Sequence, residues 1–298
     1  MKIDEVVEFL DAKFHPEYQE DYDNAGFLVG CGGDECTGVL VALDLTEAVV
    51  AEAKSLGYNL IVTHHPFIFR GMKRITDRND SGRLIIDMVR NGLATYAAHT
   101  NLDNLPDGVN GILAEKLGLM NCRILRASSE FGVQSAELSG CGNSNSELRV
   151  PWCAVGSADN SELIGAGMIG ELPCEMDAEG FLQTVKKRLG LPWVRVSGER
   201  KTVRRVAICG GAGSFLIGDA MRAGADAFLT ADLKYHDFQI DAPHPASEGG
   251  NGHMLLADIG HYESEQFAKE IIYRAISEKF SNFACRISEC QQSVVHYI

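Results

Sequence analysis

Residues 60–66 read LIVTHHP, an apolar run that ends in two adjacent histidines and a proline. The apolar part has the composition of a strand buried on both faces of a parallel sheet. Ligand sites in α/β proteins gather where such strands end. His64 and His65 therefore stand where a site is expected, and neutral imidazole is the commonest metal-binding side chain. Taken alone, the stretch fits a histidine pair without a ligand equally well.

The surroundings of this stretch are repeated later in the chain in a degenerate form. Each copy has a strand, a helix, a turn with Gly57 or Gly224, an apolar strand ending in Thr, a further strand and a helix. The first copy covers 39–44, 46–56, 60–63, 94–98 and 108–117, and the second covers 205–210, 214–222, 227–230, 253–257 and 264–280. Alternating strands and helices predict right-handed parallel crossovers and a layered α/β fold.

The amino-acid composition changes between the two copies. Residues 127–165 are rich in Ser, Gly and Asn, which indicates loops and short antiparallel strands. A strand at 167–172 and a helix at 178–189, ended by Gly190, follow. We therefore expect a first domain at 1–125 and a second at 126–298 that includes the variable segment 127–165.

Composition limits the class of protein. The 298 residues are 45% hydrophobic and 23% charged, and no run of about 18 apolar residues predicts a membrane span. The acidic N-terminal stretch has helical spacing and no secretory signal, so we expect a cytoplasmic protein. The net charge of −14 argues against binding nucleic acid through its phosphates. The nine cysteines form no C-x-x-C pair, which indicates reduced thiols, with Cys209 the best-placed candidate nucleophile.

Further candidate ligands follow other predicted strands. Asp103 comes just after the strand that ends at His99, and His261 and Glu265 come just after the strand at 253–257. His261 and Glu265 are four residues apart, so they share one face at a helix start. Histidines mixed with carboxylates suit Zn, Fe, Mn or Ni better than Mg or Ca. A carboxylate can also bridge two metal ions, as in two-metal hydrolases.

Each of these residues also has a purely structural explanation. His261 and Glu265 fit a surface pair, and Asp103 fits a cap of the following helix. His99 fits a buried, hydrogen-bonded histidine that supports a ligand.

His236 occupies a place in the second copy close to that of the histidine pair, which makes it a candidate for substrate contact or proton transfer. The turn GGAGS at 210–214 fits either a tight turn or a phosphate cradle, and it lacks the lysine of a P-loop.

The order of these motifs resembles that of a known family, the GTP cyclohydrolase 1 type 2 homologues, also called the NIF-three-like family. The matching segments are DNAGFLVG at 23–30, THHP at 63–66, HTNLD at 99–103, GGAGS at 210–214 and GHYESE at 260–265. They span nearly the whole chain. Tyr22, Ala25 and Phe27 depart from the residues that are common in the family, and 125–165 matches poorly, which leaves substrate access from that side open.

The resemblance implies two similar α/β domains with layered mixed sheets and a metal site between them. It implies two divalent metal ions held by His64, His65, Asp103, His261 and Glu265, and a ring-shaped homohexamer with the metal sites facing its inner cavity.

The leading hypothesis is a di-metal hydrolase that acts on a nucleotide or a related small molecule, with GTP suggested by the resemblance alone. His64, His65, Asp103 and His261 would be terminal ligands, Glu265 a bridge, and His99 or His236 the proton-transfer residue. The alternative is a non-enzymatic metal-binding or partner-binding regulatory scaffold. A nucleotide-binding domain with incidental histidines is a third interpretation.

Overall fold

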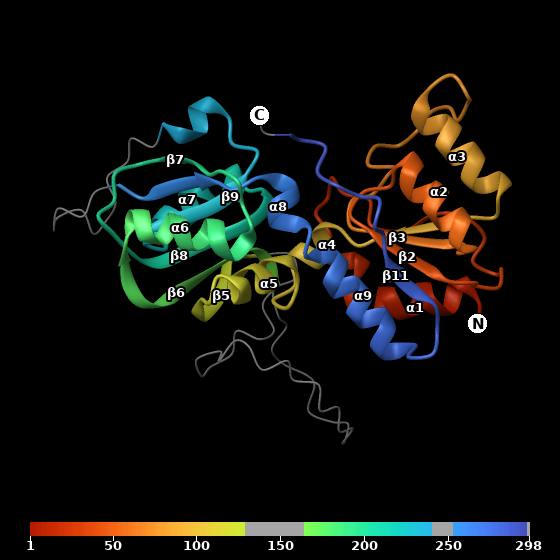
Figure 1. Cartoon of the computed structure of the whole chain (residues 1–298), viewed down its shortest axis with the longest axis horizontal. Coiled ribbons are helices and arrows are strands. Elements are labelled where there is room, and N and C mark those ends of the chain that lie inside the picture. Colours follow the sequence, from red (N-terminus) through yellow and green to blue (C-terminus); the bar gives the residue numbers. More distant parts are fainter. Residues whose placement is uncertain (129–163, 240–252, 297–298) are drawn as a thin grey trace, which may run out of the picture. The chain divides into compact units, whose positions relative to one another are not determined.

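The computed structural model describes residues 1–128, 164–239 and 253–296. The chain divides into two compact units, one formed by Met1–Val109 with Glu265–Ile298 and the other by Asn110–Ser264. Each unit contains one mixed sheet with helices packed against it (Figure 1). The predicted α/β fold with two layered mixed sheets is therefore confirmed.

The sheet of the first unit has five strands in the order β1-β4-β3-β2-β11. Its strands are β1 (Gly26–Val29), β2 (Val39–Ala42), β3 (Leu60–Thr63), β4 (Ala94–Ala97) and β11 (Cys285–Ile287). Strands β2, β3 and β4 are parallel, as predicted, and Thr63 is paired with both Ala42 and Ala97. All three strands therefore end at the same level, which brings the residues that follow them to one edge of the sheet.

Helices cover both faces of this sheet. They are α1 (Ile3–Phe14), η1 (Pro16–Tyr18), α2 (Glu47–Leu56), α3 (Asp80–Arg90), α4 (Thr100–Asp103) and α9 (Ala268–Lys279). Helices α2 and α3 lie on one face, and α1 and α9 lie on the other (Figure 1). The side chain of Thr46 caps α2 by accepting a hydrogen bond from the Val49 N–H, and Gly57 ends that helix with φ 70°.

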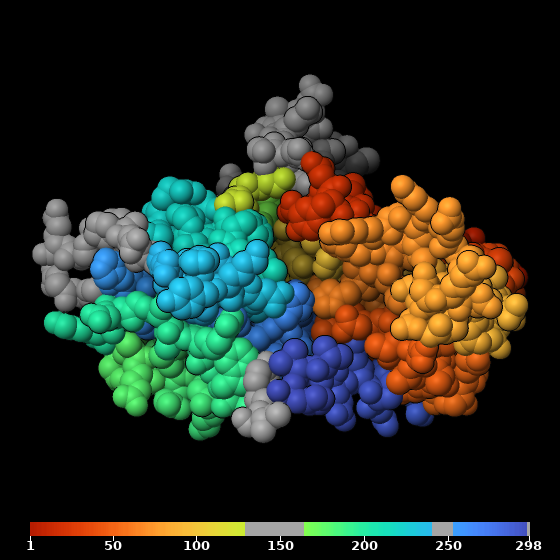
Figure 2. Space-filling view, turned by 90° about the horizontal axis from the view of Figure 1, so that it is seen from above, coloured from red at the N-terminus to blue at the C-terminus, as the bar shows by residue number. Residues whose placement is uncertain are grey.

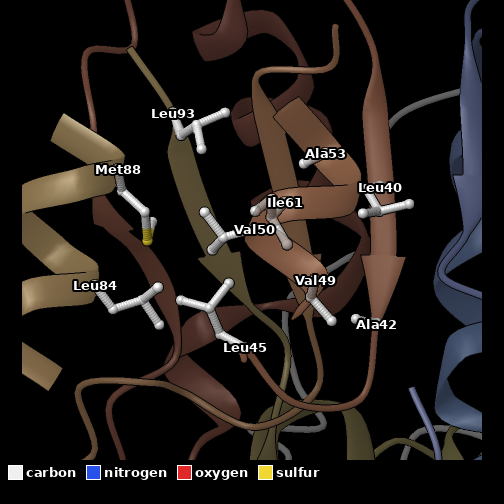
Figure 3. Packing of buried hydrophobic residues seen from close by; sticks show 10 residues of the cluster. All are labelled: Leu40, Ala42, Leu45, Val49, Val50, Ala53, Ile61, Leu84, Met88 and Leu93. Carbon is white, nitrogen blue, oxygen red and sulfur yellow. The ribbon is translucent and has the colours of Figure 1, made fainter. Parts of the chain in front are cut away.

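The core between α2, α3 and the sheet is aliphatic (Figure 3). It consists of Leu40, Ala42, Leu45, Val49, Val50, Ala53, Ile61, Leu84, Met88 and Leu93. On the other face, the ring of Phe9 in α1 packs edge-on against Phe280, with 5.4 Å between ring centroids. Because both faces are covered, every residue of β2, β3 and β4 is buried, as the apolar run at 60–63 predicts.

The sheet of the second unit has six strands in the order β5-β6-β8-β9-β10-β7. They are β5 (Met120–Ala127), β6 (Gly165–Asp177), β7 (Arg195–Ser197), β8 (Thr202–Ala212), β9 (Ala227–Ala231) and β10 (Leu255–Asp258). Its helices are α5 (Val109–Lys116), α6 (Ala178–Leu189), η2 (Ser214–Leu216), α7 (Ile217–Arg222), η3 (Tyr235–Phe238) and α8 (His261–Glu265). Strands β8, β9 and β10 are parallel, so both copies of the predicted repeat have the same strand arrangement.

Two features differ from the sequence-based expectations. The first unit ends at Val109 rather than near 125, and the C-terminal segment from Glu265 returns to it. The reason is pairing: β5 joins β6 in the second sheet, whereas β11 joins β2 in the first. The helix expected at 264–280 is divided into α8 and α9. Most of the segment 127–165 lies outside the described residues.

Among the described residues, no helix is both long enough and apolar enough to cross a membrane.

Candidate metal centre

The two histidines extend strand β3 beyond its last residue. The His64 N–H donates to the Ala42 carbonyl over 3.2 Å, and the His65 N–H donates to the Leu43 carbonyl over 2.9 Å. Strand β4 leads in the same way to His99 and then to the short helix α4, which ends at Asp103. The parallel sheet thus brings two predicted site segments of the first unit, 64–65 and 99–103, to one edge.

His64 is completely buried, and its ring is fixed by one hydrogen bond. Its Nδ1 donates to the Ala98 carbonyl over 2.7 Å, which leaves Nε2 with its lone pair. Nε2 lies 3.6 Å from Asp103 Oδ1 and 3.9 Å from Glu265 Oε2 and has no hydrogen-bond partner among the described residues. Burial lowers the pKa of His64 to about 3. The imidazole is therefore neutral near pH 7 and presents a lone pair to two carboxylates.

His65 lies between two carboxylates. Its Nδ1 is 2.7 Å from Asp44 Oδ1 and its Nε2 is 2.9 Å from Glu265 Oε2. Burial alone would lower the pKa of His65, but hydrogen bonds and charge from Asp44 and Glu265 raise it to about 10. A histidine held by a carboxylate at one ring nitrogen is the usual arrangement of a metal-binding histidine, whose other nitrogen faces the ion.

Potential ligand atoms converge at this edge of the sheet. The ligand atoms of His64, Asp103 and Glu265 lie within 4.8 Å of one another, and so do those of His64, His65 and His99. The side chain of Glu265 is only 5% exposed, and that of Asp103 is 20% exposed. Together, an imidazole lone pair and two carboxylates form a donor set that could hold a divalent metal ion.

His99 is held by a buried carboxylate. Its Nδ1 lies 2.7 Å from Asp23 Oδ1, and Asp23 Oδ2 accepts hydrogen bonds from the backbone N–H and hydroxyl of Thr100. Its ring centroid is 5.3 Å from that of His64 and 5.4 Å from that of His65. His99 is therefore a fixed imidazole beside the candidate ligands, as a proton-transfer residue would need to be.

The network around Asp23 predicts a pH dependence of stability. Burial alone would raise the pKa of Asp23, but the hydrogen bond and charge of His99 and further hydrogen bonds lower it from 3.8 to about 2. The ionised carboxylate therefore stabilises the fold above pH 3.8, and this contribution is lost as the pH falls toward 2. The midpoint of urea unfolding of the wild type should therefore fall as the pH is lowered over that range, and we expect it to fall less steeply in Asp23→Asn. A decline as steep as in the wild type would contradict this assignment.

The two remaining predicted site residues belong to the second unit. His261 begins helix α8, one turn before Glu265, and its Nδ1 lies 2.8 Å from Asp232 Oδ2. After His65 and His99, it is thus the third imidazole described with a carboxylate on one ring nitrogen. His236 is exposed on η3, where its Nδ1 lies 3.4 Å from Gln239 Oε1.

The backbone N–H groups of the glycine-rich turn at 210–214 are hydrogen-bonded within the second unit. The Gly210 N–H donates to Asn110 Oδ1 and the Gly211 N–H donates to Ser264 Oγ, each over 3.0 Å. A Cβ on Gly213 would stand 2.4 Å from Thr230 Oγ1. These contacts favour the tight-turn interpretation over a phosphate cradle. Cys209, the candidate nucleophile, is buried beside this turn.

An open pocket of about 520 Å³ lies in the first unit between the starts of helices α2 and α3. Its lining includes Leu45 and Phe67, which follow Asp44 and His65 closely in the chain, together with residues at the start of α3. In the space-filling view, the segment 66–90 forms the orange-to-gold part of this unit's surface (Figure 2). The volume is that of a small-molecule site.

Three supporting residues were not assigned a role from the sequence. Asp44 holds His65, Asp23 holds His99, and Gln291 donates through Nε2 to Asp44 Oδ2 over 2.9 Å. The strand-end rule that finds His64 could also have found Asp44, because Asp44 lies just beyond β2. No local pattern points to Gln291, which is 247 residues away from Asp44.

Comparison with known proteins finds a matching family model and similar relatives. The family model of Duf34/NIF3 (NGG1p interacting factor 3) matches residues 1–293. A Clostridium perfringens protein named GTP cyclohydrolase 1 type 2 homolog is 32% identical over 266 residues, which are 89% of this chain and 87% of the relative. A Staphylococcus epidermidis protein of the same name is 30% identical, with 91% of each chain covered.

Solved structures show the same fold. A Staphylococcus aureus hypothetical protein superposes with a TM-score of 0.78 at 29% identity, and a Bacillus cereus protein related to NIF3 superposes with a TM-score of 0.81 at 26% identity. Each comparison covers 100% of this chain and 99% of the other. The chain belongs to the Duf34/NIF3 family.

Proposed function

We propose that this protein is a divalent-metal-dependent hydrolase whose ligands are His64, His65, Asp103, His261 and Glu265. The observation that carries the proposal is the buried Nε2 of His64, which faces the carboxylates of Asp103 and Glu265 and has no hydrogen-bond partner within residues 1–128, 164–239 and 253–296. An imidazole lone pair beside two carboxylates is a donor set that suits a divalent transition-metal ion.

The donor set fits Zn, Fe, Mn or Ni, because it mixes imidazoles with carboxylates. When bound, a pair of such ions lowers the pKa of water toward ~7 and supplies hydroxide at neutral pH. Glu265 lies 3.9 Å from His64 Nε2 and 2.9 Å from His65 Nε2, which supports its assignment as the bridging ligand. His261 precedes Glu265 by one turn of α8, which supports its inclusion.

The chain's own residues orient these groups and move protons. The Ala98 carbonyl fixes the ring of His64 at Nδ1, and the Asp44 carboxylate fixes the ring of His65 at Nδ1. The Nε2 atom of each ring then faces Glu265. Asp23 fixes His99 in the same way, and His99 is therefore the group that we propose for proton transfer. His236 remains the second candidate for this role, in an exposed position on η3.

The substrate that we propose is a nucleotide or a related small molecule. The relatives named GTP cyclohydrolase 1 type 2 homolog support this class. Assembly into a homohexamer is likewise proposed, on family membership alone.

The proposal is tested with metal-loaded protein and a panel of nucleoside triphosphates that includes GTP, with products followed by chromatography. We expect the wild type to hydrolyse a member of the panel. His99→Ala should lose about 100-fold in rate, within the usual range for a general acid or base, and keep its metal. His15→Ala, which removes a partly exposed histidine of the same unit, is the control. Metal-loaded protein that turns over no nucleotide would favour the regulatory scaffold instead.

A further inference from the structure

The C-terminal segment follows strand β2 toward the candidate metal site. Strand β11 pairs with β2 in parallel, with Cys285 opposite Val39 and Ile287 opposite Val41. The Ser288 N–H continues this ladder by donating to the Val41 carbonyl over 2.8 Å. Because β2 ends near Asp44, the segment that follows β11 reaches the edge of the sheet where His65 lies.

Glu52 of helix α2 holds this segment in place. Its carboxylate accepts hydrogen bonds from the Ser288 hydroxyl over 2.6 Å, from the Glu289 N–H over 3.1 Å and from the Cys290 thiol over 3.0 Å. These bonds lower the pKa of Glu52, although burial opposes them. Three donors on one carboxylate fix the path of the chain immediately before Gln291. We call residues 288–291 the C-terminal clasp.

The side-chain amide of Gln291, at the end of the clasp, is hydrogen-bonded through both its oxygen and its nitrogen. The Leu43 N–H donates to Oε1, and Nε2 donates to Asp44 Oδ2 over 2.9 Å. A backbone N–H can only donate, so Oε1 must face Leu43 and the NH2 group must face Asp44. The other oxygen of Asp44, Oδ1, lies 2.7 Å from His65 Nδ1. Each oxygen of the Asp44 carboxylate therefore has its own donor.

We propose that Gln291 is a positioning residue for the metal site: the C-terminal clasp fixes the Asp44 carboxylate and, through it, the ring of His65. This inference rests on the proposed function, because it assigns to Gln291 an effect on metal affinity. A carboxylate held at only one oxygen can rotate about its side-chain torsions, whereas Asp44 is held at both. Groups that orient a ligand commonly change metal affinity by 10- to 100-fold.

The experiment compares four variants of the full chain. Gln291→Ala removes the amide, and Gln291→Glu keeps an acceptor for the Leu43 N–H but loses the donor to Asp44. Glu52→Ala releases the clasp. Gln292→Ala is the matched control, because Gln292 is exposed next to Gln291. Two properties are measured: the Zn²⁺ affinity, by competition with a chelating dye, and the His65 Nδ1–H signal in the metal-free protein, by ¹⁵N-histidine NMR.

We expect Gln291→Ala and Gln291→Glu to lose about tenfold in Zn²⁺ affinity, the lower end of the range for groups that orient ligands. Both should weaken or shift the His65 Nδ1–H signal, while Gln292→Ala matches the wild type in both measurements. Glu52→Ala should act in the same direction, and combining it with Gln291→Ala should add little, because the two residues act through one contact.

The two proposals fail in different ways. Wild-type protein that binds no Zn²⁺ would contradict the metal site, yet the His65 signal would still respond to Gln291→Ala. An unchanged His65 signal in Gln291→Ala, in protein that unfolds at the wild-type temperature, would overturn the role of Gln291 even if metal binds. A Gln292→Ala variant that loses as much Zn²⁺ affinity as Gln291→Ala would overturn it as well.

Discussion

Protein carrying both His64→Ala and Glu265→Ala is expected to lose its divalent metal. Both side chains are buried, and Glu265 faces the Nε2 atoms of His64 and His65. We expect affinity for Zn²⁺ to fall by more than about 100-fold, beyond the range seen for groups that merely orient ligands. The measurement is Zn²⁺ content by elemental analysis after dialysis, paired with a competition titration.

The matched control replaces the same residue types where no metal is proposed. His15 is partly exposed beside Glu17, and Glu263 lies on the same helix as Glu265, so His15→Ala with Glu263→Ala should retain the wild-type metal content. The pKa of His64 is lowered to about 3, so its ring is neutral near pH 7 and forms no ion pair with Asp103. A loss of metal in the double variant would therefore reflect the loss of a ligand and not the loss of a salt bridge. Unchanged metal in the first double variant would exclude these two residues as ligands.

Ile61→Ala is expected to destabilise the first unit by about 2–5 kcal/mol, the usual cost of truncating a buried isoleucine to alanine. Ile61 lies in the middle of β3 and packs in the cluster between the sheet and helices α2 and α3 (Figure 3). Its removal leaves a cavity that the surrounding helices fill only in part. The measurement is the midpoint of urea unfolding, with the slope compared to confirm that the same surface unfolds.

Ile75→Ala serves as the control for this prediction, because Ile75 is 52% exposed. The same truncation there should change the free energy of unfolding by no more than about 0.5 kcal/mol. A similar midpoint for both variants would mean that Ile61 does not pack in a core, and the strand assignment that positions His64 would lose its support.

The parallel strands were predictable because their signal is local. Each of the segments 39–44, 60–63 and 94–98 is an apolar run long enough for a buried strand, and the strands β2, β3 and β4 lie within them. The strand-end rule led to His64, His65 and Asp103, and the structure brings His64 Nε2 to within 3.6 Å of Asp103 Oδ1 at this edge of the sheet. The same reasoning found the parallel strands of the second unit.

What the sequence did not predict depends on contacts between distant segments. Strand β11 has three residues and no apolar run of its own, and only its pairing with β2 makes it a strand. The return of the C-terminal segment to the first unit follows from that pairing and moves the unit boundary. Gln291 reaches Asp44 for the same reason, so its role becomes visible only in the folded chain.

Metal content tests most directly whether His64, Asp103 and Glu265 converge on a metal site. The measurement is elemental analysis of wild-type protein purified without added metal or chelator, expressed as ions per chain. We expect about two divalent transition-metal ions per chain, as in two-metal hydrolases. Protein that carries none, and that takes up none from equimolar Zn²⁺, Mn²⁺, Fe²⁺ or Ni²⁺, would contradict this expectation.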